Sequence, residues 1–441
     1  MLHRFSAGVI TSFVVVLLLR IAGLSSATLT TAQLLDWQDM PLFTLLSKPD
    51  PAAQEIIRQY LQTWSAKGAV ARHQGIWIQS GMTKLAENRG EVPLPGASLT
   101  KIATTLASLE KWGPSHQFET LVSATGPIKN GVLQGDLVIT GGGDPFFVWE
   151  EAIALGNSLN QLGIRRVTGS LVVNGDFYVN YQQHPALAGQ ILQQGLNSRS
   201  WTPRGFTFRY NLMPKGTPKP QVAIARGVKV ASIATPKKYL LLRHRSISLA
   251  QILKEMNVHS NNEMAEMLTK SLGGTQVRNQ LVAKSANVPL DEIQLVNGSG
   301  LGLENKISPR AVCILLMEVE RFLQPYKLTI ADVFPVSGPD KLGTMYGRHM
   351  PLGTTIKTGT LNNVSALAGV MPTRDRGLVW FAIMNRGGDV LEFRKQQDQL
   401  LTSLTQKWGI SPTTYANTTQ SPPLLGDPKR NEKISGIQTK V

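Results

Sequence analysis

A serine and a lysine spaced by one helical turn are the first residues of this sequence that could do chemistry together. Ser98 precedes Lys101 by three positions, just after the break at Pro95-Gly96 and at the start of a helix-compatible stretch. Residues three apart share a helix face, so the two side chains meet. A serine hydroxyl needs a neighbouring base, and a lysine whose pKa is lowered by burial and nearby cations can serve as one. The spacing therefore predicts a Ser-Lys nucleophile at a helix N-terminus, where the dipole favours negative charge.

This spacing alone is a weak signal, and for Ser98 taken by itself a helix N-cap is the favoured explanation. The same pattern recurs at Ser108 and Lys111 near the other end of the same predicted helix. There the helix dipole disfavours a serine anion, so we interpret the second copy as a chance match.

Two further motifs supply partners for the serine and the lysine. Ser260-Asn261-Asn262 opens a predicted helix, where an N-cap is again the simpler explanation. Lys357-Thr358-Gly359-Thr360 lies on the first strand of a predicted three-stranded meander that continues through the apolar run 366–371. Ser-x-x-Lys, Ser-x-Asn and Lys-Thr-Gly in this order, each in its expected context, form a specific combination.

With these motifs the chain resembles the penicillin-binding proteins and serine β-lactamases. It is most similar to the class C low-molecular-mass penicillin-binding proteins, the D-alanyl-D-alanine carboxypeptidase/endopeptidase family of the DacB type, over roughly residues 30–405. Asn297-Gly298-Ser299-Gly300-Leu301 and Gly141-Gly142-Gly143-Asp144-Pro145 also match this family. The resemblance implies an α/β penicillin-binding-protein/β-lactamase-like transpeptidase domain, in which helices flank an antiparallel sheet beside a helical subdomain, with a β-rich inserted domain.

The resemblance also implies a role for each motif residue. Ser98 attacks the penultimate carbonyl of a stem peptide ending in D-Ala-D-Ala, Lys101 takes the proton, and Ser260 relays it with Lys357 behind. Lys357 would also keep Lys101 neutral by raising the local positive potential. Substrate would be held by Asn262, Thr358, Gly359 and Thr360, with the N–H groups of Ser98 and Thr360 as the oxyanion hole.

The expected function is that of a serine D-Ala-D-Ala carboxypeptidase that forms an acyl-enzyme, also cleaves cross-links as a DD-endopeptidase and is inhibited covalently by β-lactams. A β-lactamase-like hydrolase and a non-catalytic peptidoglycan-binding envelope protein remain as alternatives. Three positions depart from the family pattern: Gly96 is an extra residue before Ala97, Asn297 replaces an acid, and Lys341 replaces a common glycine.

The order of apolar and polar segments predicts four parts in five segments. Residues 1–27 form a signal peptide or anchor, residues 28–120 and 235–410 the catalytic domain, residues 121–234 the inserted domain, and residues 411–441 a disordered tail. The insert is expected to contain short strands, including one at Phe206–Tyr210, and one helix at Glu150–Leu162. The signal predicts export to the periplasm or cell envelope, and leaves peripheral or signal-anchored membrane association open.

Composition narrows the partners. The chain has 45 basic and 29 acidic residues among 441, a net charge of +16. Its basic residues are scattered without a nucleic-acid motif, so we expect no nucleic-acid partner, and the excess suits anionic wall polymers or a membrane surface. The seven histidines show no metal-ligand spacing, which predicts no metal or other cofactor. Cys313 is the only cysteine and is expected to be buried. Oligomeric state is left open.

Overall fold

The computed structural model of the chain describes residues 46–47, 49–231, 238–411 and 422–434. The chain divides into two compact units, Met1–Leu46 and Ser47–Val441, and the described residues belong almost entirely to the second. The predicted signal at residues 1–27 lies outside the described residues. No helix within the described ranges is long and apolar enough to cross a bilayer.

A six-stranded sheet in the order β1-β3-β2-β18-β17-β16 carries the predicted meander. Its strands are β1 (Leu46–Ser47), β2 (Gln74–Ser80), β3 (Thr83–Asn88), β16 (Thr355–Leu361), β17 (Val364–Thr373) and β18 (Gly377–Arg386). All pairs from β3 to β16 are antiparallel, so the meander with Lys357 on its first strand is confirmed. Every residue of β17 is buried, whereas β16 lies at the edge of the sheet.

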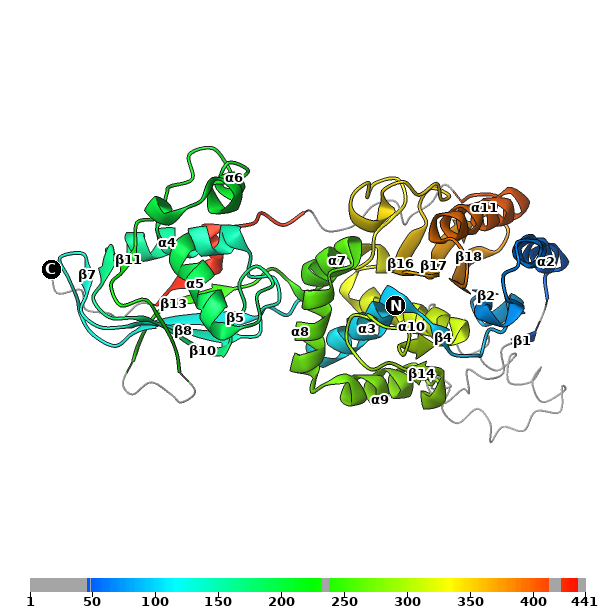
Figure 1. Ribbon diagram of the computed structural model, residues 1–441, viewed down its shortest axis with the longest axis horizontal. Coiled ribbons are helices and arrows are strands. Elements are labelled where there is room, and N and C mark those ends of the chain that lie inside the picture. The colour runs from blue at the N-terminus through cyan, green and yellow to red at the C-terminus, as the bar shows by residue number, and fades with distance from the viewer. Residues whose placement is uncertain (1–45, 48, 232–237, 412–421, 435–441) are drawn as a thin grey trace, which may run out of the picture. The chain divides into compact units, whose positions relative to one another are not determined.

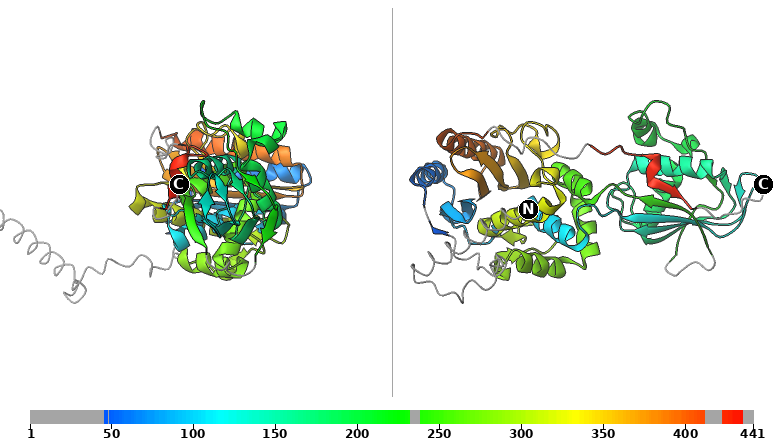
Figure 2. Two further views of the ribbon diagram at one scale, coloured as in Figure 1. Left: turned by 90° about the vertical axis from the view of Figure 1, so that its left-hand side faces the viewer. Right: turned by 180° about the vertical axis from the view of Figure 1, so that it is seen from behind.

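Helices cover both faces of this sheet (Figures 1 and 2). Helix α2 (Pro51–Ala66) is capped by Asp50, whose carboxylate accepts hydrogen bonds from the free backbone N–H groups of the first turn. It packs beside α11 (Val390–Trp408), and their apolar side chains share one core with the sheet. Helix α10 (Pro309–Leu323) contacts β2 and β18 and carries the buried Cys313.

A helical subdomain adjoins the sheet and contains α3 (Thr100–Trp112), α7 (Leu249–His259), α8 (Asn262–Leu272) and α9 (Thr275–Ser285). Ser248 caps α7 in a capping box with Gln251, and Asn261 caps α8. All residues of α3 from Thr100 to Leu109 are buried, so this helix forms the centre of the subdomain. A small three-stranded sheet lies beside this subdomain. Its strand order is β14 (Ile293–Gln294), β15 (Lys306–Ile307) and β4 (Leu94–Pro95).

The segment between α3 and α7, joined by β19 from the far end of the chain, forms two further sheets. The larger has the order β12-β10-β8-β5-β13-β19, and the smaller β11-β9-β7-β6. Their strands are β5 (Glu119–Ala124), β6 (Ile128–Lys129), β7 (Val132–Leu133), β8 (Leu137–Gly142), β9 (Arg166–Val167), β10 (Leu171–Asp176), β11 (Ala223–Ile224), β12 (Val228–Val230), β13 (Tyr239–Arg245) and β19 (Asn431–Lys433). Strand β13 pairs with β5, so the larger sheet continues past residue 234, the end that the sequence predicts for the insert.

The insert also holds more helix than the sequence predicts. Besides α4 (Trp149–Gln161), it contains α5 (Pro185–Gly195) and α6 (Phe208–Tyr210), which follows a π-helical turn at Pro203–Thr207. The predicted strand at Phe206–Tyr210 is therefore wrong. Its alternating aromatic residues do not share a face: Phe206 is buried between two tryptophan rings, whereas Phe208 is exposed.

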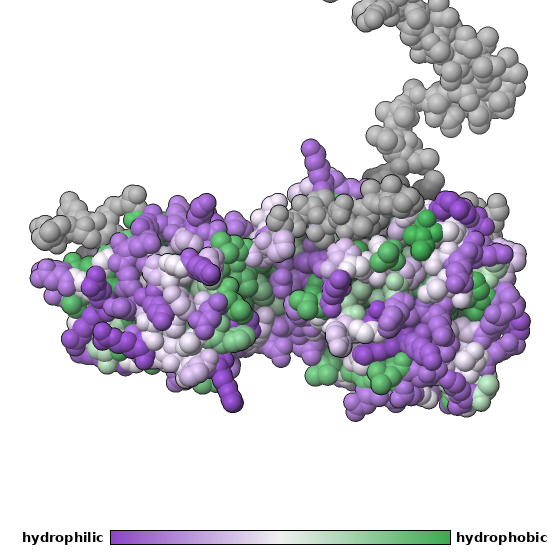
Figure 3. All heavy atoms as spheres, turned by 90° about the horizontal axis from the view of Figure 1, so that it is seen from above, coloured by the Kyte–Doolittle hydropathy of each residue, from purple (hydrophilic) through white to green (hydrophobic). Residues whose placement is uncertain are grey.

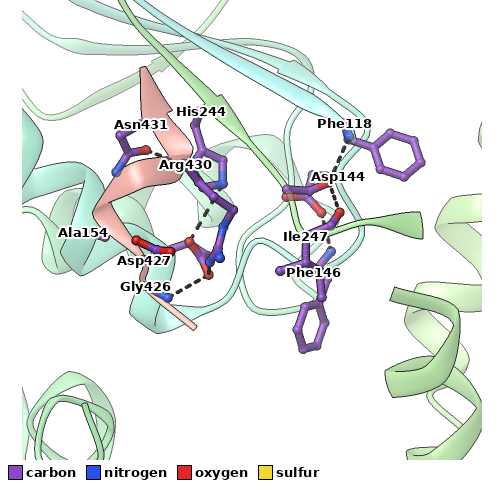
Figure 4. A network of polar contacts seen from close by, with 12 residues as sticks. Phe118, Asp144, Phe146, Ala154, His244, Ile247, Gly426, Asp427, Arg430 and Asn431 are labelled. Carbon is purple, nitrogen blue, oxygen red and sulfur yellow. Dashed lines mark hydrogen bonds and ion pairs between the residues drawn. The ribbon is translucent and has the colours of Figure 1, made fainter. Parts of the chain in front are cut away.

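The predicted disordered tail is wrong for residues 422–434. Strand β19 pairs antiparallel with β13, and a buried polar network holds it there (Figure 4). Arg430 forms an ion pair with the buried Glu151, and His244 Nδ1 lies 2.8 Å from Asn431 Oδ1. These partners lie far apart in sequence, so local composition does not reveal them. Residues 412–421 and 435–441 lie outside the described residues.

The remaining helical elements are short turns: Ala71–His73, Ala97–Leu99 (η3), Ser198–Ser200, Leu290–Glu292, Gln324–Tyr326, Ile330–Asp332, Gly343–Met345 and Pro428–Arg430. The face of the molecule in Figure 3 is mainly hydrophilic, with apolar side chains in small separate groups.

Candidate active site

The Ser98 turn is positioned by the tight 3₁₀ segment η3 immediately before α3. Leu99 N–H donates to Gly96 O at 3.0 Å and closes this turn, while Gly96 N–H is held by Asn305 O. Ala97 adopts a left-handed backbone with φ of 47°. Ser98 Oγ lies 2.9 Å from Lys101 Nζ. The extra Gly96 thus leaves the serine in contact with its predicted base.

Lys101 is completely buried and has three polar neighbours. Its Nζ lies 2.8 Å from Asn262 Oδ1 and 2.8 Å from the Ser299 carbonyl oxygen, in addition to Ser98 Oγ. The amide and carbonyl oxygens can only accept hydrogen bonds. A neutral amine therefore donates both of its hydrogens to them and turns its lone pair to the Ser98 hydroxyl. The geometry fits a base that takes the serine proton.

The electrostatic surroundings of Lys101 agree with this neutral form. Burial lowers the pKa of Lys101 to about 7, and the charges of Glu266 and Glu263 oppose the shift. Of the two expected causes, burial and nearby cations, desolvation by burial is the dominant one.

Ser260 and Lys357 form the second pair of the site. Lys357 is fully buried on β16, and its Nζ donates to Ser260 Oγ at 2.9 Å and to the Thr358 carbonyl oxygen at 2.9 Å. Burial, and then the charge of Lys101, hold the pKa of Lys357 well below its ordinary value. The two buried lysines thus disfavour simultaneous protonation.

Ser260 occupies the junction between two helices. It ends α7 in the left-handed conformation, with φ of 51° and ψ of 40°, and the next residue caps α8. Such a backbone is uncommon for a residue other than glycine. Asn261, not Ser260, is the N-cap of α8, so capping does not explain the serine.

Asn262 faces Lys101 through its amide oxygen, as described above. Within the described residues its amide nitrogen has no hydrogen-bond partner, so an N–H donor remains for another group. Thr358 is nearly buried and Thr360 is exposed. The hydroxyl of Thr360 accepts a hydrogen bond from Arg394 on α11 at 2.8 Å.

Gly359 is required for the close approach of β16 to η3. A Cβ at this position would lie 2.6 Å from Gly96 O and 3.1 Å from Ser98 N. The missing side chain therefore makes room for the serine turn. In the described chain, strand pairing on the other edge of β16 is limited to a bridge between Val336 and Thr355.

A second layer of residues positions the loop whose Ser299 carbonyl oxygen contacts Lys101. None of these residues is assigned a role from the sequence. Glu266 accepts hydrogen bonds from the backbone N–H groups of Gly298 at 2.9 Å and Ser299 at 2.8 Å. The fully buried Arg278 donates to Asn297 O at 2.8 Å. Glu266 follows Asn262 by one helical turn on α8, so the two share a helix face. This spacing is the feature of the sequence that could have placed Glu266 near the site.

The departures at Asn297 and Lys341 have local consequences only. The Asn297 side chain accepts from Gly300 N–H at 2.7 Å and donates to Leu301 O at 2.7 Å, which shapes the loop that carries Ser299. A carboxylate could not make the second bond. Lys341 is exposed.

The structure therefore brings Ser98, Lys101 and Asn262 together, and separately Ser260 and Lys357, with β16 beside the serine turn. His259 belongs to neither group, and its Nε2 lies 3.5 Å from Glu255 Oε2. The described residues contain no cluster of three or more His, Cys, Asp or Glu side chains suited to a metal ion.

An antiparallel sheet between helices, a helical subdomain and a serine-lysine pair at the start of the central helix define the architecture of penicillin-binding proteins. The chain belongs to the D-Ala-D-Ala carboxypeptidase 3 (S13) family, which it matches over residues 57–197 and 216–407. This confirms the predicted resemblance and the expectation of a serine D-Ala-D-Ala carboxypeptidase.

Curated relatives agree. D-alanyl-D-alanine carboxypeptidase DacB of Haemophilus influenzae is 23% identical over 390 residues, which cover 66% of this chain and 80% of the relative. D-alanyl-D-alanine carboxypeptidase of Actinomadura sp. is 26% identical over 441 residues, which cover 76% of this chain and 81% of the relative.

Solved structures agree on the fold. Bd3459, a predatory peptidoglycan endopeptidase from Bdellovibrio bacteriovorus, superposes with a TM-score of 0.69 at 22% identity, covering 82% of this chain and 98% of that chain. Penicillin binding protein 4 (dacB) from Haemophilus influenzae superposes with a TM-score of 0.60 at 18% identity, covering 80% of this chain and 99% of that chain. The predicted fold class is confirmed.

Proposed function

We propose that this protein hydrolyses the terminal D-Ala-D-Ala bond of peptidoglycan stem peptides through an acyl-enzyme on Ser98. One observation carries the proposal: the Ser98 hydroxyl lies 2.9 Å from the buried Lys101 amine, whose two other neighbours, the Asn262 and Ser299 oxygens, can only accept hydrogen bonds. That arrangement leaves the lysine lone pair for the serine proton.

In the first step the Ser98 proton moves to Lys101 Nζ while Oγ bonds to the penultimate carbonyl carbon. The N–H groups of Ser98 and Thr360 stabilise the oxyanion, and removal of one such donor typically costs about 3 kcal/mol. The C–N bond then breaks as Lys101 passes this proton to Ser260 and Ser260 gives its own hydroxyl proton to the departing D-Ala amine, which leaves Lys101 neutral and Ser260 as a hydroxyl. Water then attacks the ester while Lys101 takes its proton, and that proton passes to Ser98 Oγ as the C–O bond breaks, which restores the Ser98 hydroxyl and releases the shortened peptide.

Substrate binds along the edge of β16. Asn262 donates its unpaired amide hydrogen to the substrate backbone, and Lys357, Thr358 and Thr360 hold the terminal carboxylate. The carboxylate favours the charged form of Lys357, which is most easily reached while Lys101 is neutral. The sparsely paired outer edge of β16, beside Gly359, accommodates an extended peptide as an added strand.

The family and the relatives' names support two extensions. A β-lactam would acylate Ser98 and leave slowly; the relatives' printed names include a penicillin-binding protein. Cross-link cleavage by the same groups is a second candidate, since a structurally similar protein is titled a peptidoglycan endopeptidase. A family whose substrate is the cell wall, together with the predicted export signal, supports a place in the bacterial envelope or periplasm; peripheral or signal-anchored membrane association would follow from that signal.

We also propose the division of the chain into a catalytic domain, on both sides of an inserted domain that spans residues 119–245. Strand membership supports this division, because β5 and β13 bound the larger sheet of the insert.

A fluorescent penicillin tests the nucleophile. The purified protein should be labelled covalently, and Ser98→Ala should abolish the label without loss of folding. Absence of label on the wild-type protein, or label on Ser98→Ala, would contradict the proposal and favour a non-catalytic wall-binding protein. Rapid turnover of the penicillin would favour a β-lactamase. A pentapeptide compared with a cross-linked muropeptide separates carboxypeptidase from endopeptidase activity.

A further inference from the structure

Arg394 joins α11 to the strand that carries the Lys-Thr-Gly motif. It lies near the start of that helix, and its Nη2 donates to Thr360 Oγ1 at 2.8 Å. Neither the motifs nor the proposed chemistry above uses this arginine.

The guanidinium of Arg394 is half-buried and lacks an anionic partner. Within the described part of the chain, the Thr360 hydroxyl is its one hydrogen-bond acceptor, and no carboxylate lies within ion-pair distance of it. Nearby Asp398 is already engaged, because Arg348 binds it through two nitrogens. A guanidinium has five N–H donors, so most of those on Arg394 are left for another acceptor.

The surroundings of Arg394 favour an anion. It lines an open cavity of about 940 Å³ between α11 and the loop before β16. The walls of this cavity carry three basic side chains, Arg348, Arg394 and Lys395, and one acidic side chain, Asp398. Burial, and then the charge of Arg348, lower the pKa of Arg394, and the charge of Asp398 opposes this shift.

We propose that Arg394, together with Thr360, binds the carboxylate that follows the scissile bond and thereby selects substrates with a free C-terminal carboxylate. This inference rests on the proposed function, which gives the site a substrate with such a carboxylate. A planar guanidinium forms paired, charge-assisted hydrogen bonds with a carboxylate, and one N–H already holds the hydroxyl that shares the task. The part of a larger leaving group beyond that carboxylate would enter the cavity.

Two peptides that differ at one group test the inference. One ends in D-Ala-D-Ala with a free carboxylate, and the other ends in D-Ala-D-alaninamide. Arg394→Gln should lower kcat/KM for the acid by about 10- to 100-fold, the usual value of a hydrogen bond to a charged group, and change kcat/KM for the amide by less than about threefold. Arg394→Lys should restore only part of the loss, because it keeps the charge without the planar fork.

Lys407→Gln is the matched control, since Lys407 lies on the same helix and is exposed but does not line the cavity. This variant should leave kcat/KM unchanged for both peptides. Equal losses on acid and amide in Arg394→Gln would overturn the inference in favour of a structural role, and so would unchanged rates on both. If Arg394→Gln does not fold, the acid-to-amide ratio of Arg394→Lys decides in the same way. A wild-type protein that neither cleaves the acid nor accepts penicillin would instead overturn the proposed function itself.

Discussion

The two buried lysines are the residues whose chemistry depends most on their surroundings. Lys101 and Lys357 are both without solvent exposure, and each contacts a different serine hydroxyl. Burial penalises the ammonium form of each, and the charge of one raises the penalty on the other. Proton transfer from Ser98 therefore depends on the protonation state of both lysines.

The pKa of Lys101 predicts the pH dependence of acylation. The base must be neutral, and burial lowers the pKa of Lys101 to about 7. The acylation rate constant for a chromogenic penicillin should therefore rise about tenfold per pH unit below this pKa and level off above it. Stopped-flow measurement at constant ionic strength checks the profile. A flat profile, or an inflection near the ordinary lysine pKa, would contradict the assignment of Lys101 as base.

Ser260 allows chemistry and backbone strain to be separated. Its left-handed conformation suits glycine better than alanine, so Ser260→Gly should be more stable than Ser260→Ala by about 1 kcal/mol. Both variants lack the hydroxyl bonded to Lys357, and both should lose turnover about 100-fold or more. Urea unfolding and peptide hydrolysis provide the two measurements. Wild-type turnover in either variant would exclude Ser260 as the proton relay.

At the scale of elements, the site is assembled where three segments meet. The η3 turn carries Ser98, the α7–α8 junction carries Ser260, and β16 carries Lys357. The distances between them depend on how closely β16 approaches η3, and Gly359 sets that approach.

Gly359→Ala should therefore damage the site from inside the sheet. The new Cβ would lie 2.6 Å from Gly96 O, a backbone atom that cannot move aside without displacing the serine turn. We expect a loss of stability of about 1–3 kcal/mol and a fall in penicillin acylation of about 100-fold. Asn363→Ala, in the exposed turn after β16, is the control and should change neither. Normal acylation of Gly359→Ala would show that the contact between β16 and η3 is not needed.

At the scale of the whole molecule, the last described segment belongs to a sheet that begins about three hundred residues earlier. β19 extends the sheet that starts with β5, and the buried Glu151 receives hydrogen bonds from Arg430 and from Gly426 N–H. An isolated buried carboxylate is costly, so this segment stabilises the insert.

Arg430→Met should accordingly destabilise the protein by about 3–5 kcal/mol, because it leaves Glu151 buried without its cation. Adding Glu151→Gln should recover part of this loss, since the uncompensated charge is then removed. Lys429→Met, at the exposed neighbouring position, should have little effect on the same urea-unfolding curves. Equal stability of the Arg430→Met and wild-type proteins would show that the segment does not hold the insert together.

The sequence by itself determined the family, the order of the motifs and the meander that carries Lys357. These are local patterns: a turn followed by a helix with Ser98 and Lys101 on one face, or alternating apolar strands. It also marked Asn262 and Thr360, though not the side chains that contact them.

Only the tertiary structure decided which groups meet across long sequence separations. It places the Ser299 carbonyl against Lys101, the Glu266 carboxylate behind that loop, and Arg394 on Thr360. It also makes burial the dominant cause of the lowered pKa of Lys101, because desolvation depends on everything packed around the amine. Composition suggested disorder at the C-terminus for the same reason that it missed these contacts: the partners of Arg430 and Asn431 are supplied by strands and helices distant in the chain.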